Sequence, residues 1–127
     1  MDYGYTTGQV FLLKDTILTP QNLAILYTAY KQIYPFNEYP LPPASKVKFV
    51  ITKTNARYGR FDSTNMAIEI SGRSCGHYNT VLAVLLHEMV HLALFVTKTD
   101  GWNRHGSAFL KLKHKYAHMY SLDPKAI

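Results

Sequence analysis

The chain has 127 residues, a length that suits one domain around one hydrophobic core. Hydrophobic residues make up 47% of it and charged residues only 17%, which excludes an intrinsically disordered chain. The formal net charge of +6 permits binding to nucleic acid without requiring it. The single cysteine, Cys75, excludes an internal disulfide and any zinc finger built from several cysteines. It is typical of a reducing compartment, so we expect a cytoplasmic protein, or one of the nucleus or a host-cell interior.

The first expected element is a helix that begins at Thr19 and Pro20. Threonine is a good N-cap, and proline suits the first helical position. Apolar residues then recur at three- and four-residue intervals until Pro35, which should end the helix. Residues 1–18 are expected to form a tail, with 10–13 as a candidate short strand. No signal peptide and no membrane-spanning segment are evident.

Three short strands are expected next. Residues 46–53 alternate between polar and apolar side chains, which predicts a half-buried strand whose inner face carries Val47, Phe49 and Ile51. Residues 57–61 and 66–71 predict two more strands, joined by a hairpin turn over 62–65. Strands that follow one another so closely favour an antiparallel meander.

A buried helix is expected over 81–95, VLAVLLHEMVHLALF, in which only His87, Glu88 and His91 are polar. A helix that is apolar on every side lies in a core, where polar groups need partners. Residues four apart share a helix face, so the two imidazoles can both reach one metal at about 2.0–2.1 Å, the usual Zn–N distance. Glu88 then lies beside the ion, where it suits proton transfer from an activated water better than ligation. The alternative is that these three are ordinary core residues whose polar groups form hydrogen bonds within the protein.

A polar loop over 97–104 is expected before a last helix over 108–120. This helix has an apolar face and, on the other side, a polar stripe of Lys111, His114, Lys115 and His118. The order helix, sheet, buried helix, helix predicts one α+β domain over 1–127. In it, a small, mostly antiparallel sheet should pack against the N-terminal, buried and C-terminal helices.

A catalytic zinc takes three protein ligands and keeps one position open. No glutamate follows Glu88, which excludes the thermolysin-like arrangement with a Glu from a later helix. Leu94 and Thr97 stand where the metzincin pattern needs Gly and His. Asp100 lies in a Thr-Asp-Gly turn, where aspartate usually serves the backbone. A histidine is therefore the expected third ligand.

The remaining histidines are one in the loop before the buried helix, two on the polar stripe and one before the last helix: His77, His114, His118 and His105. His105 is the best candidate, because Phe109 and Leu112 would hold the last helix against the buried one and keep His105 facing the motif. Gly106 after it allows a close backbone approach or an unusual dihedral angle.

The segments HEMVH (87–91) and RHGSAF (104–109) resemble the SprT family of zinc metalloproteases, whose pattern is HExxH, a loop, then His-Gly-x-x-Phe. Residues 57–60 and 66–71 also resemble the family's Gly-containing strand and its Ile-x-Leu-Ser strand. The likeness spans roughly 19–120, most of the chain.

The resemblance implies a minimal zincin fold in which His87, His91 and His105 bind zinc and Glu88 is the catalytic base for peptide-bond hydrolysis. In the Spartan type of this family, the substrates are proteins crosslinked to DNA. Members often carry a cysteine zinc ribbon or other DNA-binding modules after the protease domain. No cysteine pair follows here, so we expect DNA targeting, if any, from the domain itself or from a partner.

The expected partners are a protein or peptide substrate and, as a further candidate, single-stranded DNA. Positive charge and one aromatic ring near the site are the candidate DNA contacts: Lys98, Trp102, Arg104, Lys111 and Lys115. Taken alone, these residues favour a simpler interpretation, in which the lysines lie on a solvated helix face and Trp102 packs on the domain. The resemblance to the SprT family is what favours DNA binding.

Two other functions stay open: a compact metalloprotease with another target, and a binding module that zinc only stabilises. Closed structural sites have four protein ligands, so three histidines beside Glu88 favour catalysis. An extended substrate is expected to pair with an exposed edge of the strand over 66–71. The group that stabilises the oxyanion is left open among Tyr58, Tyr78, Arg104 and Tyr116.

Overall fold

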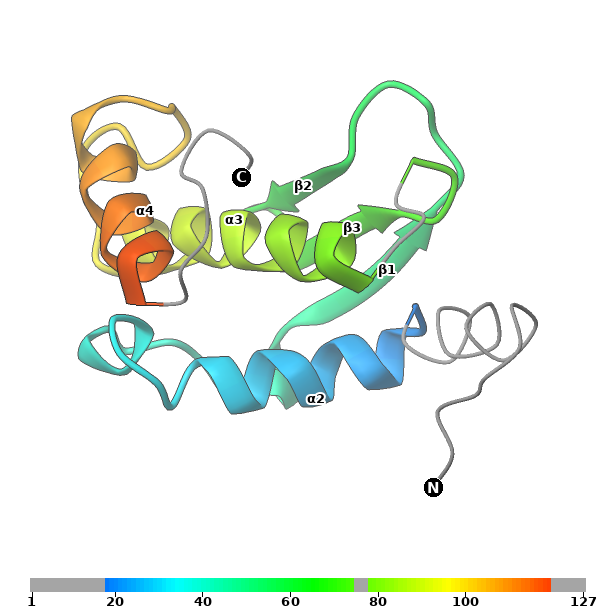
Figure 1. Ribbon diagram of the computed structural model, residues 1–127, viewed down its shortest axis with the longest axis horizontal. Helices are drawn as coiled ribbons and strands as arrows, with labels where there is room; N and C mark the ends of the chain where they lie inside the picture. The colour runs from blue at the N-terminus through cyan, green and yellow to red at the C-terminus, as the bar shows by residue number, and fades with distance from the viewer. Residues whose placement is uncertain (1–17, 75–77, 120–127) are drawn as a thin grey trace.

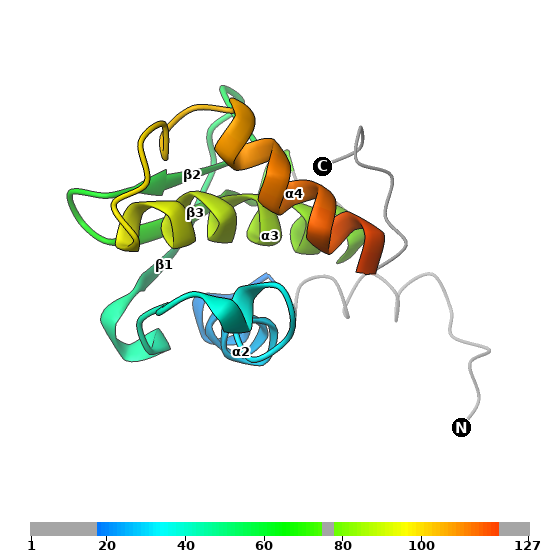
Figure 2. The same cartoon turned by 90° about the vertical axis from the view of Figure 1, so that its left-hand side faces the viewer.

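The computed structural model describes residues 18–74 and 78–119, without the side chains of residues 78, 79 and 119. Helix α3 (Tyr78–Val96) occupies the middle of the molecule. It lies between a small sheet and helix α2 (Pro20–Tyr30), and helix α4 (Ser107–Met119) packs beside its C-terminal half (Figures 1 and 2). This is the expected α+β arrangement of a sheet and three helices, with two short 3-10 turns (Phe36–Glu38 and Ala44–Lys46) between α2 and the sheet.

Helix α2 begins as predicted. Thr19 is its N-cap and accepts a hydrogen bond from the Asn22 backbone N–H at 3.1 Å, and Pro20 takes the first helical position. Its end was predicted wrongly, because the helix stops at Tyr30 and does not continue to Pro35. The amides of Gln32 and Ile33 bond three residues back, to the carbonyls of Ala29 and Tyr30, so the α-helical hydrogen-bond pattern ends here.

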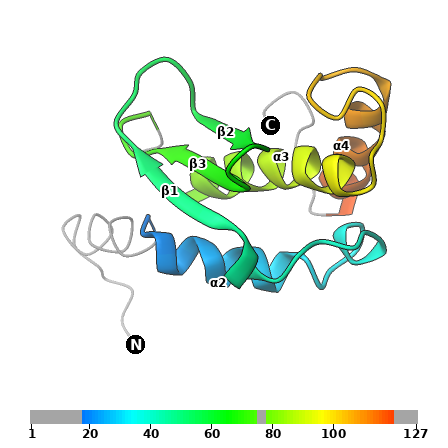
Figure 3. The same ribbon diagram turned by 180° about the vertical axis from the view of Figure 1, so that it is seen from behind.

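The sheet contains strands β1 (Lys48–Thr52), β2 (Gly59–Asp62) and β3 (Ala67–Ser71) in the order β1-β3-β2 (Figure 3). The hairpin joining β2 to β3 is antiparallel, as expected, and Asp62 accepts hydrogen bonds from the turn amides of Thr64 and Asn65. The antiparallel meander is wrong, because β1 pairs with β3 and runs parallel to it.

The burial of β3 explains this order. Ala67, Ile68 and Ile70 are all at most 3% exposed, so the most apolar strand takes the centre and is covered on both edges. The strand over 66–71, expected to offer an edge to substrate, therefore has none. The two edges of the sheet belong to β1 and β2.

Helix α3 is buried on nearly all sides, which confirms the expectation from its apolar sequence. Leu85, Leu86, Met89, Val90 and Leu92 are 0% exposed. The described part of the chain contains no helix with the length and apolarity needed to cross a membrane. The candidate strand over 10–13, and also Cys75 and His77, lie outside the described residues.

Candidate metal centre

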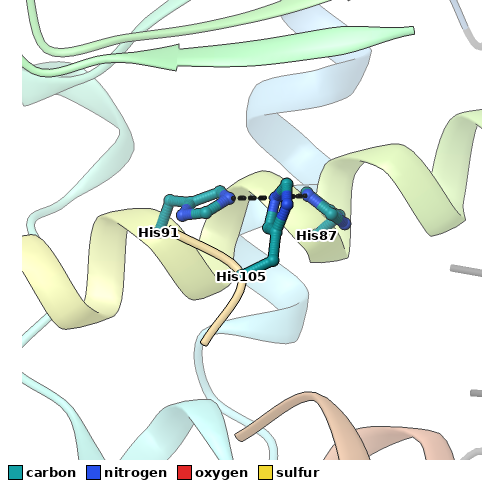
Figure 4. Close-up of side chains that lie close together, drawn as sticks. All are labelled: His87, His91 and His105. Carbon is teal, nitrogen blue, oxygen red and sulfur yellow. Dashed lines mark hydrogen bonds between the residues drawn. The ribbon is translucent and has the colours of Figure 1, made fainter. Parts of the chain in front are cut away.

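Three histidines converge beside α3 (Figure 4). His87 and His91 lie one turn apart on the helix, and His105 comes from the loop before α4. The Nε2 atom of His105 lies 3.1 Å from Nε2 of His87 and 3.1 Å from Nε2 of His91. Among the described residues, this trio is the one group of histidine, cysteine and acidic side chains whose ligand atoms lie within 4.8 Å of one another.

The donor set fits a divalent metal such as zinc. A tetrahedral zinc with Zn–N distances of about 2.0–2.1 Å separates its nitrogen ligands by about 3.3–3.4 Å, close to the 3.1 Å seen here. Hydrogen bonds alone do not account for the arrangement, because one proton on His105 Nε2 can be donated to only one of its two neighbours. A cation at the centre satisfies all three nitrogens.

The backbone of the loop orients His91. Its Nδ1 lies 2.7 Å from the carbonyl oxygen of Trp102, which can only accept a hydrogen bond. The Nδ1 atom therefore carries the proton, and Nε2 presents its lone pair to the centre. The Trp102 ring packs against Phe61 of β2 and Phe95 of α3, with ring centroids 6.0 Å and 4.9 Å away, and this packing fixes the loop.

Phe109 of α4 supports all three histidines. Its ring is 1% exposed, and its centroid lies 4.7 Å from His87, 4.8 Å from His91 and 4.7 Å from His105. This packing holds α4 against α3 and places His105 opposite the motif. The expectation for Gly106, a close backbone approach or an unusual dihedral angle, is wrong. The φ of Gly106 is not positive, and a Cβ at this position would meet nothing within 4 Å.

Glu88 lies next to the histidines but is not one of the converging ligands. It is 5% exposed, and burial raises the pKa of its carboxyl to about 7, although a hydrogen bond from the Phe61 backbone N–H acts in the opposite direction. A carboxyl with this pKa exchanges protons near neutral pH, as a general base must. Glu88 was predicted from the motif, whereas nothing in the spacing of the sequence pointed to Phe61.

Burial also keeps the helix histidines neutral, which is the form that binds metal. It lowers the pKa of His87 to about 3, with smaller contributions from His91, His105 and Lys113. Burial lowers the pKa of His91 as well, although the hydrogen bond to Trp102 raises it. Neutral imidazoles are available as ligands across the whole physiological range of pH.

The other histidine and acidic candidates lie apart from the centre. His114 and His118 are exposed on α4, as their place on the polar stripe predicted, and Asp100 is exposed in the loop. Of the oxyanion candidates, Tyr116 is fully buried, Tyr58 is 61% exposed and Arg104 is exposed. The Tyr78 side chain lies outside the described residues.

The candidate DNA contacts have different surroundings. Lys98, Arg104 and Lys111 are exposed, and Lys115 is partly buried. Trp102 is partly buried against Phe61 and Phe95, so its ring serves the loop rather than standing free for a base.

The comparisons with known proteins agree with this site. The model of the SprT-like family matches residues 24–125, which include α3, the loop and α4. Neither the curated proteins nor the solved structures contain a match to the chain.

Proposed function

Because the chain belongs to the SprT-like family, we propose that it is a zinc-dependent metalloendopeptidase. The observation that carries the proposal is the convergence of His87, His91 and His105 beside a buried carboxyl, Glu88. Three imidazoles with an adjacent carboxylate base are the usual composition of a hydrolytic metal site.

The three histidines would hold the zinc, which, when bound, acidifies water and polarises a carbonyl group. Glu88 accepts a proton from the attacking water and later gives it to the amine that leaves the cleaved peptide bond. Without the metal, its pKa of about 7 means that the carboxyl gains and loses a proton near neutral pH, as both transfers require. Trp102 and Phe109 keep His91 and the rest of the histidine cluster in place.

We place the substrate along the outer edge of β2. The Ser71 N–H of β3 donates to the carbonyl of Tyr58, just before β2, so the alternation of an antiparallel ladder turns the backbone groups of Gly59 and Phe61 outward. The Phe61 N–H is taken by Glu88, which leaves the N–H and carbonyl of Gly59 and the carbonyl of Phe61 to pair with a substrate. This edge lies on α3, whereas the edge of β1 lies on the far side of the sheet and packs on α2. An extended peptide added to β2 would pass close to Glu88.

Single-stranded DNA is the further partner that we propose, as the Spartan type of this family suggests. The net charge of +6 and the exposed Lys98, Arg104 and Lys111 support it. The buried setting of Trp102 means that binding would rely on phosphate contacts rather than on stacking. A peptidase with no role for DNA is the alternative.

A site that only stabilises the fold is disfavoured, because a closed structural zinc site has four protein ligands and the described part of the chain brings three together. The deciding experiment is incubation of a denatured protein with the zinc-loaded chain, with and without DNA and after treatment with a chelator. We expect cleavage that requires the metal. Full zinc occupancy without cleavage under either condition would refute the peptidase assignment.

A further inference from the structure

Strand β2 touches α3 more closely than a strand with side chains on that face could. A Cβ built on Gly59 would lie 2.5 Å from Cγ1 of Val84 and 3.4 Å from Oε2 of Glu88. Val84 and Glu88 are one turn apart on the same face of α3, so the backbone of Gly59 occupies the notch between them. A Cβ there would also lie 2.8 Å from the backbone oxygen of Glu69 on β3. Any other residue would therefore force β2 away from both neighbours.

The close approach has a second consequence two residues along the strand. The Phe61 N–H points outward from β3 and donates to the Glu88 carboxylate. This hydrogen bond exists only while β2 lies against α3. Glu88 is 5% exposed, so solvent water can hardly replace the Phe61 N–H as a hydrogen-bond donor to its carboxylate.

We propose that β2 positions the catalytic base, with Gly59 as the residue that lets the strand pack against α3 and the Phe61 amide as the group that holds the Glu88 carboxylate. The proposal rests on the proposed function only in calling Glu88 the base, because the contact itself is a property of the fold. Gly59 and Phe61 are positioning residues, since both act on the reaction through Glu88.

The contact can be tested without any activity measurement, by hydrogen exchange at single amides followed by NMR in the full chain. We expect the Phe61 amide to be protected in the wild type and to exchange at least tenfold faster in Glu88→Ala. The Arg60 amide faces β3 in the ladder and should stay protected in both proteins, which makes it the internal control. Equal exchange at Phe61 in the two proteins would overturn the proposal, whether or not the chain is a peptidase.

The role of Gly59 is tested by Gly59→Ala. We expect zinc affinity within about twofold of the wild type, faster exchange at Phe61, and a fall in kcat of about a hundredfold, the size that a misplacement of about 1 Å can cause. The added methyl group points toward α3 and not toward the outer edge, so KM should change little. Retained kcat together with retained protection at Phe61 would overturn the assignment of Gly59.

Two further variants separate positioning from a general loss of stability. Gly59→Ala combined with Val84→Ala removes the nearest clash, and we expect it to recover part of kcat and of the protection at Phe61. Recovery should be incomplete, because the Glu69 oxygen belongs to the backbone and cannot move aside.

Gly72→Ala, directly after β3, is the control for strain elsewhere in the sheet. It places a methyl 3.2 Å from Ile51 Cγ2, away from Glu88, and should leave kcat unchanged. An equal fall of kcat in Gly72→Ala would show that strain anywhere in the sheet lowers kcat, and it would overturn the specific role of Gly59. If Gly59→Ala does not fold, the comparison at Phe61 between wild type and Glu88→Ala still decides whether β2 holds the base.

Discussion

The Nδ1 atom of His91 lies 2.7 Å from the backbone oxygen of Trp102, so a main-chain carbonyl determines which ring nitrogen of His91 faces the candidate metal centre. A carbonyl keeps its position only if its loop does. Here Lys98 and Gly101 adopt left-handed backbone conformations with φ of 55° and 81°, and these bring the loop back over α3. The Trp102 ring then anchors the loop against Phe61 and Phe95.

Replacing the Trp102 ring should therefore weaken zinc binding although the ring touches no metal. We expect Trp102→Ala to lower zinc affinity by about 10–100-fold, the usual cost of disturbing the partner of a metal ligand. Competition with a chromogenic chelator measures this affinity. Trp102→Phe keeps an aromatic ring on Phe61 and Phe95 and should lose much less. Equal affinity in Trp102→Ala and the wild type would show that the carbonyl holds its place without the ring.

The third ligand is tested by removing His105. We expect His105→Ala to abolish tight, stoichiometric zinc binding, because two imidazoles on α3 leave the ion mostly hydrated. His114→Ala is the matched control, since His114 is an exposed histidine on the neighbouring helix. Metal content after dialysis distinguishes the two variants. Stoichiometric zinc in His105→Ala would exclude this histidine as a required ligand.

The catalytic role that we propose for Glu88 is separable from zinc binding. We expect Glu88→Gln to keep the metal, because the carboxylate is not among the converging ligand atoms. Its kcat should fall by about 10²–10⁴-fold, the typical contribution of a general base. The measurement is cleavage of a denatured protein at equal zinc occupancy. Unchanged turnover would mean that another group takes the proton.

The features that could be predicted from the sequence depend on local spacing, whereas those that were missed depend on tertiary contacts or on backbone groups. His87, Glu88 and His91 could be predicted because the spacing of a helix is local and regular. The pairing of β1 with β3 could not, since strand order depends on which strand is most buried in the finished sheet. The Trp102 carbonyl and the Phe61 amide are backbone groups, which every residue carries, so residue identity gives no signal for them. Gly59 did carry a signal in the sequence, because a glycine within a strand often marks a close backbone approach.

Binding to single-stranded DNA should depend steeply on salt if phosphate contacts dominate. We expect affinity to fall as salt rises, with a slope of about −0.7 per phosphate contact in a plot of log affinity against log salt. Fluorescence anisotropy with a labelled oligonucleotide measures it. Lys111→Glu should weaken binding and reduce the slope, and Lys31→Glu, at the C-cap of α2, is a charge-matched control. Undetectable or salt-independent binding would remove DNA from the proposed function.

Two buried groups of the metal-free protein should affect its stability in opposite directions as pH changes. The pKa of His87 falls from 6.5 to about 3 on folding, so between these values the unfolded chain binds a proton that the folded protein does not. The free energy of unfolding then decreases as pH falls from 6.5 toward 3. The pKa of Glu88 rises from 4.5 to about 7, so between those values the folded protein binds the extra proton. This contribution to stability is fully present below pH 4.5 and is lost as pH rises toward 7.

Between pH 4.5 and 6.5 the contribution of Glu88 therefore opposes that of His87, and His91 acts in the same direction as His87 because its pKa is also lowered. Glu88→Gln should reveal the contribution of the two histidines. We expect the unfolding free energy of metal-free Glu88→Gln to rise with pH across this window more steeply than that of the wild type. The largest difference in slope is about 1.4 kcal/mol per pH unit, the value for one proton. Urea unfolding in a chelator at several pH values measures it. Parallel curves for the two proteins would show that the Glu88 carboxyl does not titrate from a raised pKa, and the proton transfers assigned to it near neutral pH would lose their support.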